Sequence, residues 1–161
     1  MKKETTQRAT LLLNCTAWIV ICLIISGLSG WVTQANIQSW YIHLQKPSFN
    51  PPNWLFGPVW TVLYIMIGIS GGILWGERKK NSPAFYCYLL QLILNFAWSF
   101  IFFGAHLIGW ALADIVAIML TTTVTVILSF KRTKIAAYLL TPYLAWIIFA
   151  LTLNAALWHL N

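Results

Sequence analysis

Residues 107–130 read LIGWALADIVAIMLTTTVTVILSF, a run of 24 residues in which Asp114 carries the only formal charge. A helix crosses the hydrocarbon core of a bilayer in about 20 apolar residues. Helices and strands of soluble domains are usually shorter and are broken by polar positions. The run therefore predicts a transmembrane helix.

Four more windows of similar length and composition are spread over the rest of the chain. Of all 161 residues, 60% are apolar and only 8% are charged, which is more apolar surface than a soluble domain of this size can bury. The composition predicts an all-α integral membrane protein, a five-transmembrane-helix bundle that forms one membrane domain over residues 1–161. The expected helices cover residues 11–32, 58–75, 84–103, 107–130 and 135–158.

The links between these windows are short, except for residues 33–57. Short links place consecutive helices side by side and antiparallel. In the long link, Pro47, Pro51 and Pro52 stiffen the chain, which predicts a shaped lid over the mouth of the bundle with Lys46 at its rim. An interfacial loop, held in the headgroup region by its aromatic side chains, is the alternative.

Proline also marks two of the expected helix starts, because its missing N–H costs nothing in the first turn of a helix. Pro58 and Pro83 stand at the beginning of two apolar windows and predict helix starts there. Pro142 instead lies inside 135–158, where it removes a hydrogen bond from the Tyr138 carbonyl and predicts a bend.

The net charge of +7 comes from ten basic and three acidic residues. Five helices place nine of the ten basic residues on one side, with Lys46 alone on the other. Because cytoplasmic loops are enriched in Lys and Arg, this predicts a cytoplasmic N-terminus and an outside C-terminus. The nine residues are Lys2, Lys3, Arg8, Arg78, Lys79, Lys80, Lys131, Arg132 and Lys134.

The first apolar window could also be a signal peptide, since basic residues precede it. Its length and the presence of Trp18 within it favour a spanning helix. A basic cytoplasmic side without a transit peptide favours a bacterial inner membrane. Nucleic-acid binding is not expected, because the basic clusters lie between apolar runs instead of forming a stripe on a polar surface.

Most enzyme chemistry is excluded by the shortage of suitable side chains. Paired-carboxylate catalysis needs two neighbouring acids, and only Asp114 lies within a helix, whereas Glu4 and Glu77 lie in a tail and a loop. No metal site is expected, because the three Cys and three His lack metal-ligand spacing. The odd Cys count, within apolar runs, indicates buried thiols instead of disulfides. These residues are Cys15, Cys22, Cys87, His43, His106 and His159.

The ten tryptophans fall into two groups. Six stand at or beyond helix ends, where an indole ring anchors at the headgroup level. Trp18, Trp60, Trp98 and Trp146 lie further inside, and the last three share helix faces with polar or aromatic groups. Broad rings with a few amides predict an apolar ligand cavity, although the same groups could serve only to join helices. The six at helix ends are Trp31, Trp40, Trp54, Trp75, Trp110 and Trp158.

Two further features allow two explanations each. Asp114 is either a functional intramembrane acid or an anchor at a helix start, where the helix dipole favours an anion. Gly68, Gly72 and Gly76 form two overlapping GxxxG units, which allow close helix approach within the bundle or across a dimer. We favour packing within the bundle.

The chain resembles the TspO/MBR family, the tryptophan-rich sensory proteins related to the translocator protein or peripheral-type benzodiazepine receptor. The resemblance covers most of the chain from about Trp40 onward. Its motifs are Trp40-Tyr41, Lys46-Pro47, Pro51-Pro52, Phe56-Gly57-Pro58-Val59-Trp60-Thr61 with Tyr64 and Gly68, Gln91 with Asn95 and Trp98, Asp114, and Pro142-Tyr143 with Trp146, Phe149 and Asn154.

The resemblance implies a five-helix bundle, usually a homodimer in the lipid bilayer, that acts as a receptor or sensor. Its cavity would bind porphyrins such as protoporphyrin IX, heme-related tetrapyrroles, and isoquinoline or benzodiazepine ligands, in tetrapyrrole transport or regulation. No cofactor is required, and the porphyrin is a ligand. The ligand-binding residues carried over are Trp40, Tyr41, Pro51, Trp60, Tyr64, Asn95, Trp98, Asp114, Trp146 and Ala150.

The sequence lacks one motif of the animal members, and two other functions are considered for it. Animal members end the last helix with a sterol-recognition motif that needs a Tyr followed by Lys or Arg, and residues 154–159 lack both. Some members are described as degrading porphyrins in light, which makes Trp60 and Trp146 candidate catalytic residues of a photo-oxidase. An ion-coupled exporter built on Asp114 ranks last, because five helices do not divide into inverted repeats.

Overall fold

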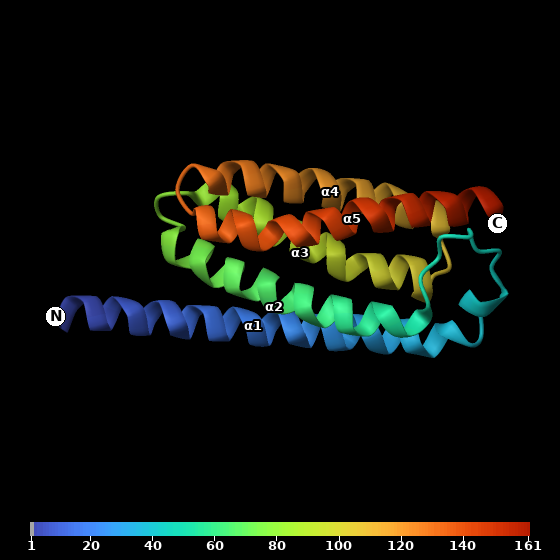
Figure 1. Ribbon diagram of the computed structural model, residues 1–161, viewed down its shortest axis with the longest axis horizontal. Helices are drawn as coiled ribbons and strands as arrows, with labels where there is room; N and C mark the ends of the chain where they lie inside the picture. Colours follow the sequence, from blue (N-terminus) through green and yellow to red (C-terminus); the bar gives the residue numbers. More distant parts are fainter. Residues whose placement is uncertain (1) are drawn as a thin grey trace.

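The computed structural model describes residues 2–161 and forms a bundle of five long helices with the two chain ends at opposite ends of the bundle (Figure 1). All five helices are long and apolar enough to cross a membrane, and the described residues contain no strand. The predicted five-helix membrane fold is therefore confirmed. The helices are α1 (Lys2–Ile37), α2 (Asn53–Glu77), α3 (Ser82–Ser99), α4 (Ile108–Phe130) and α5 (Lys134–Leu160).

Two short helical segments complete the chain between these helices. The 3-10 helix η1 (Tyr41–His43) lies in the link from α1 to α2. The π-helix η2 (Phe100–Gly104) continues α3 and widens its last turn before the link to α4. Both lie at the same end of the bundle as the C-terminus (Figure 1).

The α1–α2 link is shorter than predicted, because both flanking helices extend into residues 33–57. α1 runs on to Ile37, where Thr33 and Asn36 donate side-chain hydrogen bonds to carbonyls four residues earlier in the same helix. The expected boundaries at 32 and 58 were therefore wrong, and the lid loop is 38–52.

Proline placement explains one of these errors. α2 begins at Asn53 after Pro52, whose extended backbone (ψ 142°) precedes the first turn. Pro58 lies inside α2, where it removes only the bond to the Trp54 carbonyl near the helix end. Pro83 does lie in the first turn of α3, as predicted, and α5 continues as one helix through Pro142.

Close packing of α1 on α2 depends on glycine. A methyl group at Gly72 would collide with the Cys15 backbone, and one at Gly68 would lie 2.6 Å from the Ile19 Cα. The expectation that the GxxxG unit packs within the bundle is thus confirmed for these two residues. Gly76 is looser, since a methyl group there would lie 3.9 Å from the Asn14 amide.

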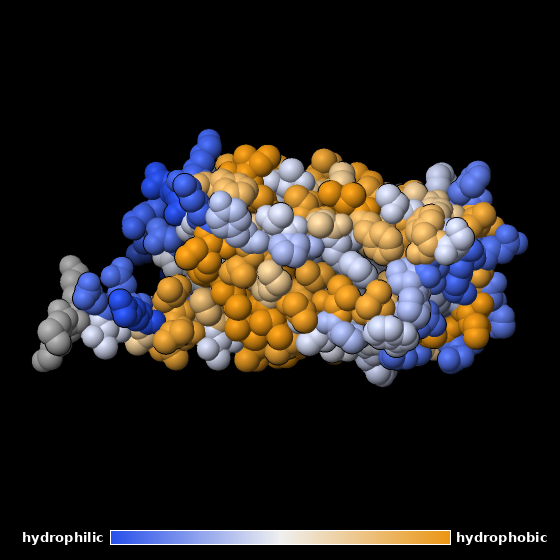
Figure 2. All heavy atoms as spheres, viewed as in Figure 1, coloured by the Kyte–Doolittle hydropathy of each residue, from blue (hydrophilic) through white to orange (hydrophobic). Residues whose placement is uncertain are grey.

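The surface divides along the length of the bundle. Apolar side chains cover the middle, and polar side chains gather at the two ends (Figure 2). The α2–α3 and α4–α5 links, which carry Arg78 to Lys80 and Lys131 to Arg132, lie at the same end as the start of α1 (Figure 1). The lid loop and the end of α5 lie at the other end, which we call the lid end.

Candidate ligand cavity

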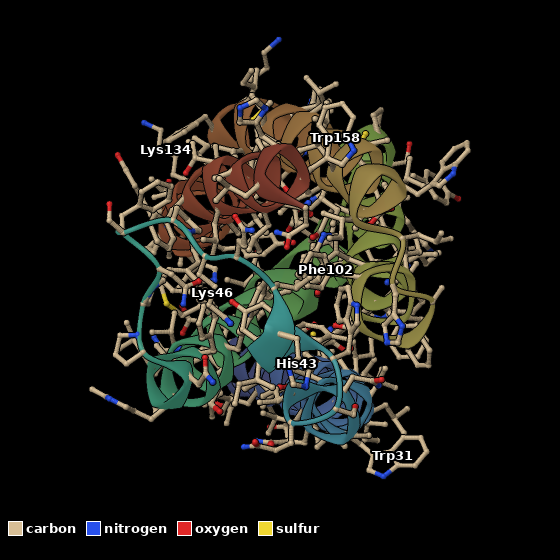
Figure 3. The ribbon with its side chains drawn as sticks, turned by 90° about the vertical axis from the view of Figure 1, so that its right-hand side faces the viewer. Trp31, His43, Lys46, Phe102, Lys134 and Trp158 are labelled. Atoms are coloured by element: carbon tan, nitrogen blue, oxygen red, sulfur yellow. The ribbon has the colours of Figure 1, made fainter. Side chains whose placement is uncertain are left out.

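A cavity of about 340 Å³ opens at the lid end between all five helices. It is bounded by the second half of α1, the first half of α2, the second halves of α3 and α5, and two residues of α4, Ile115 and Ile118. Figure 3 looks onto this end and shows the lid loop crossing the mouth, with Trp31 and Trp158 pointing outward. The cavity is thus enclosed by the bundle and partly covered by the lid loop.

The predicted aromatic side chains form one wall of this cavity. Trp60 of α2 and Trp146 of α5 meet edge to face, with ring centroids 6.5 Å apart, and Tyr64 lies 5.6 Å from Trp60. Phe56 packs on Trp146 at 6.1 Å. Such rings give a wide apolar surface with little conformational freedom.

A chain of buried hydrogen bonds fixes the polar part of the wall. The Tyr64 hydroxyl donates to the Asn95 oxygen. The Asn95 amide donates to the Tyr143 hydroxyl at 2.9 Å, which donates to the Gln91 oxygen, also at 2.9 Å. The chain ties α2, α3 and α5 together and leaves the Gln91 nitrogen without a partner among the described residues. Buried networks of this kind hold their members in one orientation.

Trp98 and Ala150 complete the predicted wall on α3 and α5. The Trp98 ring stacks on Phe102, with centroids 4.9 Å apart and planes 15° from parallel. Its Nε1 donates to the Asn154 oxygen at 3.2 Å, and Asn154 in turn donates to the Ile108 carbonyl. This second tie joins the ends of α3, α4 and α5.

α1 supplies the opposite wall of the cavity, which was not predicted from the sequence. Ser26, Ser29, Gly30 and Thr33 line the cavity, together with Gln34. Ser29 is buried, and its hydroxyl has no hydrogen-bond partner in the described chain. The missed signal is the recurrence of small or polar residues every three to four positions inside an otherwise apolar run.

Trp40 lies in the lid loop but does not line the cavity. Its ring stacks on His106 in the α3–α4 link, with centroids 4.2 Å apart and planes 16° from parallel. The His106 Nε2 also lies 3.1 Å from the Asn36 oxygen, and His106 has a left-handed backbone (φ 60°). The stack therefore joins the lid to the link before α4.

Tyr41 is the part of the lid that reaches the cavity. It is 5% exposed, and its hydroxyl donates to the Asn50 oxygen at 3.0 Å. Burial raises the pKa of the Tyr41 hydroxyl, although the bond to Asn50 acts in the opposite direction. Lys46 lies 4.8 Å from the Tyr41 ring and donates to two carbonyls of its own loop, so the ammonium group is folded onto the lid.

Asp114 does not line the cavity. It lies in the second turn of α4, is 8% exposed, and has a buried Oδ2 without a partner among residues 2–161. Pro51 is also absent from the lining, so seven of the ten predicted residues meet at the cavity. They are Tyr41, Trp60, Tyr64, Asn95, Trp98, Trp146 and Ala150.

No group of three His, Cys, Asp or Glu side chains within the described residues could hold an ion. Cys15, Cys22 and Cys87 are free, and the Cys22 thiol lies 3.6 Å from the Tyr88 hydroxyl inside the bundle.

Comparison with known proteins supports the same family as the motifs. The model of the TspO/MBR family matches residues 17–159. The tryptophan-rich protein TspO of Archaeoglobus fulgidus is 41% identical over 151 residues, covering 93% of this chain and 98% of that protein. The human translocator protein is 42% identical over 126 residues, covering 76% and 75%. The protein CrtK of Rhodobacter capsulatus is 33% identical over 126 residues, covering 76% and 79%. The chain, with five membrane-spanning helices around an aromatic cavity, belongs to the TspO/MBR family.

Proposed function

We propose that this membrane protein is a receptor or sensor for porphyrins, such as protoporphyrin IX, which bind in the cavity at the lid end. Isoquinoline and benzodiazepine ligands would occupy the same space. The observation that carries the proposal is the juxtaposition of Trp60, Trp146 and Tyr64 around an apolar cavity with fixed polar groups at its side. Flat aromatic ligands stack on such rings, and a few polar groups set their orientation.

The two walls differ in a way that suits a macrocycle with polar edges. One wall carries indole and phenol rings, and the other carries the Ser and Thr hydroxyls of α1. Ring stacking would hold the apolar face of the porphyrin against Trp60 and Trp146. The hydroxyl wall and the Asn95 amide would take its polar substituents. Lys46 could meet a propionate only after leaving its carbonyl partners in the lid.

Titration with protoporphyrin IX tests this proposal. The tryptophan fluorescence of the purified protein should fall with saturation. The affinity should drop by at least tenfold in the double variant Trp60→Leu, Trp146→Leu, since it removes two stacking contacts that are worth about 1 kcal/mol each. Trp110→Leu is the matched control, because Trp110 is 71% exposed and does not line the cavity. An unchanged affinity in the double variant would remove the stacking mechanism.

We also propose that the protein lies in a bacterial inner membrane with the basic end of the bundle in the cytoplasm. The placement of both basic links at the end where α1 starts supports this orientation. The cavity would then open to the outside. Reporter fusions at each terminus should give opposite sidedness, and the same sidedness at both would contradict the topology.

A photo-oxidase that degrades the bound porphyrin is the second candidate. The edge-to-face contact of Trp60 and Trp146 favours it, because neighbouring indoles beside an excited macrocycle can share an oxidised state. Illumination of the complex in air should give a new product that Trp60→Phe does not form. If the porphyrin is recovered unaltered after illumination of the complex, the photo-oxidase proposal is wrong and the protein only binds porphyrin.

A further inference from the structure

The lid loop is joined to the bundle by ring packing on η2 and the α3–α4 link, and by hydrogen bonds to the end of α5. On one side Trp40 stacks on His106. On the other side Asn161, which follows α5, pairs with Gln45 of the lid. We propose that Asn161 is a positioning residue that holds the lid over the cavity and sets the rate at which ligand enters and leaves. This inference rests on the proposed function, because it assumes that the cavity binds a ligand.

The Asn161 amide makes three hydrogen bonds. Its Oδ1 accepts from the Gln45 N–H at 2.9 Å, and its Nδ2 donates to the Gln45 carbonyl at 3.0 Å. The same Nδ2 donates to the Leu157 carbonyl at 2.9 Å, which ties the amide to its own helix. One side chain thus reproduces the paired N–H and C=O contacts that neighbouring β-strands make with each other.

This set of partners requires an amide in one orientation. Turning the amide over would place Nδ2 against the Gln45 N–H and Oδ1 against two carbonyl oxygens. A carboxylate has the same shape but only accepts hydrogen bonds, so it would repel both the Gln45 and the Leu157 carbonyls. A methyl side chain makes none of these bonds. Asn161→Asp therefore tests the effect of repulsion between a carboxylate and the two carbonyls, and Asn161→Ala tests the loss of the three hydrogen bonds alone.

The bonds of the lid itself show what Asn161 adds. Lys46 donates to the Ile42 and Leu44 carbonyls, and these bonds move with the loop instead of fastening it. Tyr41, which lines the cavity, lies between the Trp40 and Gln45 fastenings. Release of Gln45 would remove the hydrogen bonds between the lid and the end of α5. The loop would then be held by the packing of its Trp40 and Tyr41 rings on η2, so that the part of the lid after Tyr41 could move away from the mouth.

The exposure of the Asn161 contact suits a fastening that opens. Exposed hydrogen bonds exchange with water at little net cost, and segments held by them open more readily than a packed core. The Tyr64–Asn95–Tyr143 chain is buried, so it should open less readily than the lid. The lid can therefore open while the cavity wall keeps its shape.

Hydrogen–deuterium exchange of the ligand-free protein in nanodiscs tests the fastening without any ligand. Asn161→Ala should raise exchange in residues 38–52 by about fivefold to tenfold, and Asn161→Asp should raise it further. Peptides of α3 and α4 should be unchanged. His159→Ala is the control, because His159 is exposed near the same end of α5 and makes no hydrogen bond to the lid within the described chain. Unchanged exchange of the lid in both Asn161 variants would overturn the proposal.

Stopped-flow quenching by protoporphyrin IX tests the consequence for exchange of ligand. The association and dissociation rates should both rise by about fivefold in Asn161→Ala, so that Kd changes by less than about twofold. Distortion of the site would instead raise Kd through dissociation alone, and that result would contradict a fastening role. Unaltered association and dissociation rates in both Asn161 variants would also contradict a fastening role. Failure of the wild-type protein to bind protoporphyrin IX would overturn the proposed function, while the deuterium exchange would still decide the role of Asn161.

Discussion

The two helices α1 and α2 pack differently at the two ends of the bundle. Toward the basic end, the glycines of α2 lie against the α1 backbone, so that a methyl group at Gly72 would collide with Cys15. Toward the lid end, a methyl group at Gly30 of α1 or Gly57 of α2 would meet nothing within 4 Å. Glycine therefore allows close helix packing at one end of the bundle and borders the cavity at the other.

The surroundings of the two ends follow the same division. Near the basic end, Trp18, Trp75, Phe85 and Tyr88 fill the space between α1, α2 and α3 with rings in mutual contact. At the lid end, Trp60, Tyr64 and Trp146 also contact one another, but they border an open volume instead of filling it. Aromatic content alone therefore does not indicate a cavity, whereas rings opposite small side chains do.

Gly72→Ala should give the largest change in stability. The added methyl group would force α1 and α2 apart, and overpacking of this kind costs about 1–3 kcal/mol. Gly57→Ala on the same helix should leave stability unchanged or slightly higher, because the space is open and Ala favours helix. Thermal unfolding in detergent checks both variants. Equal losses for the two would contradict the contrast between the ends.

Gly30→Phe should abolish porphyrin binding without unfolding the protein. The ring would enter the cavity beside Ser29 and occupy the space of the ligand. Gly27→Phe is the matched control, since Gly27 has similar open surroundings but does not line the cavity. Fluorescence titration of the two variants, with thermal unfolding beside it, gives the measurement. Full binding by Gly30→Phe would place the ligand elsewhere.

Tyr143→Phe should have a smaller effect on stability, a loss of about 1 kcal/mol. The substitution removes the donor to Gln91 and the acceptor for Asn95 while keeping the ring. Porphyrin affinity should also fall severalfold, since Asn95 loses its fixed orientation. Tyr86→Phe on the exposed face of α3 serves as the comparison and should change neither quantity.

The smallest effect should come from alkaline pH acting on the lid. Burial raises the pKa of Tyr41 above its ordinary value of about 10, because the ionised phenol is less well solvated in the closed lid. The contribution of this residue to lid closure is therefore complete below pH ~10 and is lost as pH rises through the raised pKa. Deuterium exchange of residues 38–52 should increase over that range in the wild type.

Tyr41→Phe should lack that alkaline increase, because it has no hydroxyl to ionise. Deuterium exchange of residues 38–52 in this variant should be faster than in the wild type at neutral pH, since the hydrogen bond to Asn50 is lost. An identical pH profile in the two proteins would show that Tyr41 is not the group that responds.

The fold and one wall of the cavity could be predicted from the sequence because their physical signals are local. Apolar runs of bilayer length locate the helices, and helical spacing aligns Trp60 with Tyr64 and Asn95 with Trp98. The helix ends could not be placed from apolar windows, because α1 continues beyond the hydrocarbon-length window to Ile37. Pro58 was predicted to mark the start of α2, but it lies inside the helix, because a helix tolerates proline in its second turn.

The α1 wall and the position of Asp114 could not be obtained in the same way. Small side chains such as Gly30 have no property that separates an open cavity from close packing until the partner helix is placed. Asp114 is adjacent in sequence to the cavity-lining Ile115, yet it points to another side of α4. The contact between Asn161 and Gln45 joins residues 116 positions apart, which no local pattern indicates.

A structure of the protein with protoporphyrin IX bound would show whether the cavity at the lid end is the ligand site. We expect the macrocycle to lie at the lid end between the rings of Trp60 and Trp146 and the hydroxyl wall of α1, with Tyr41 over it. A macrocycle found on the bilayer-facing surface, or at the basic end of the bundle, would contradict it.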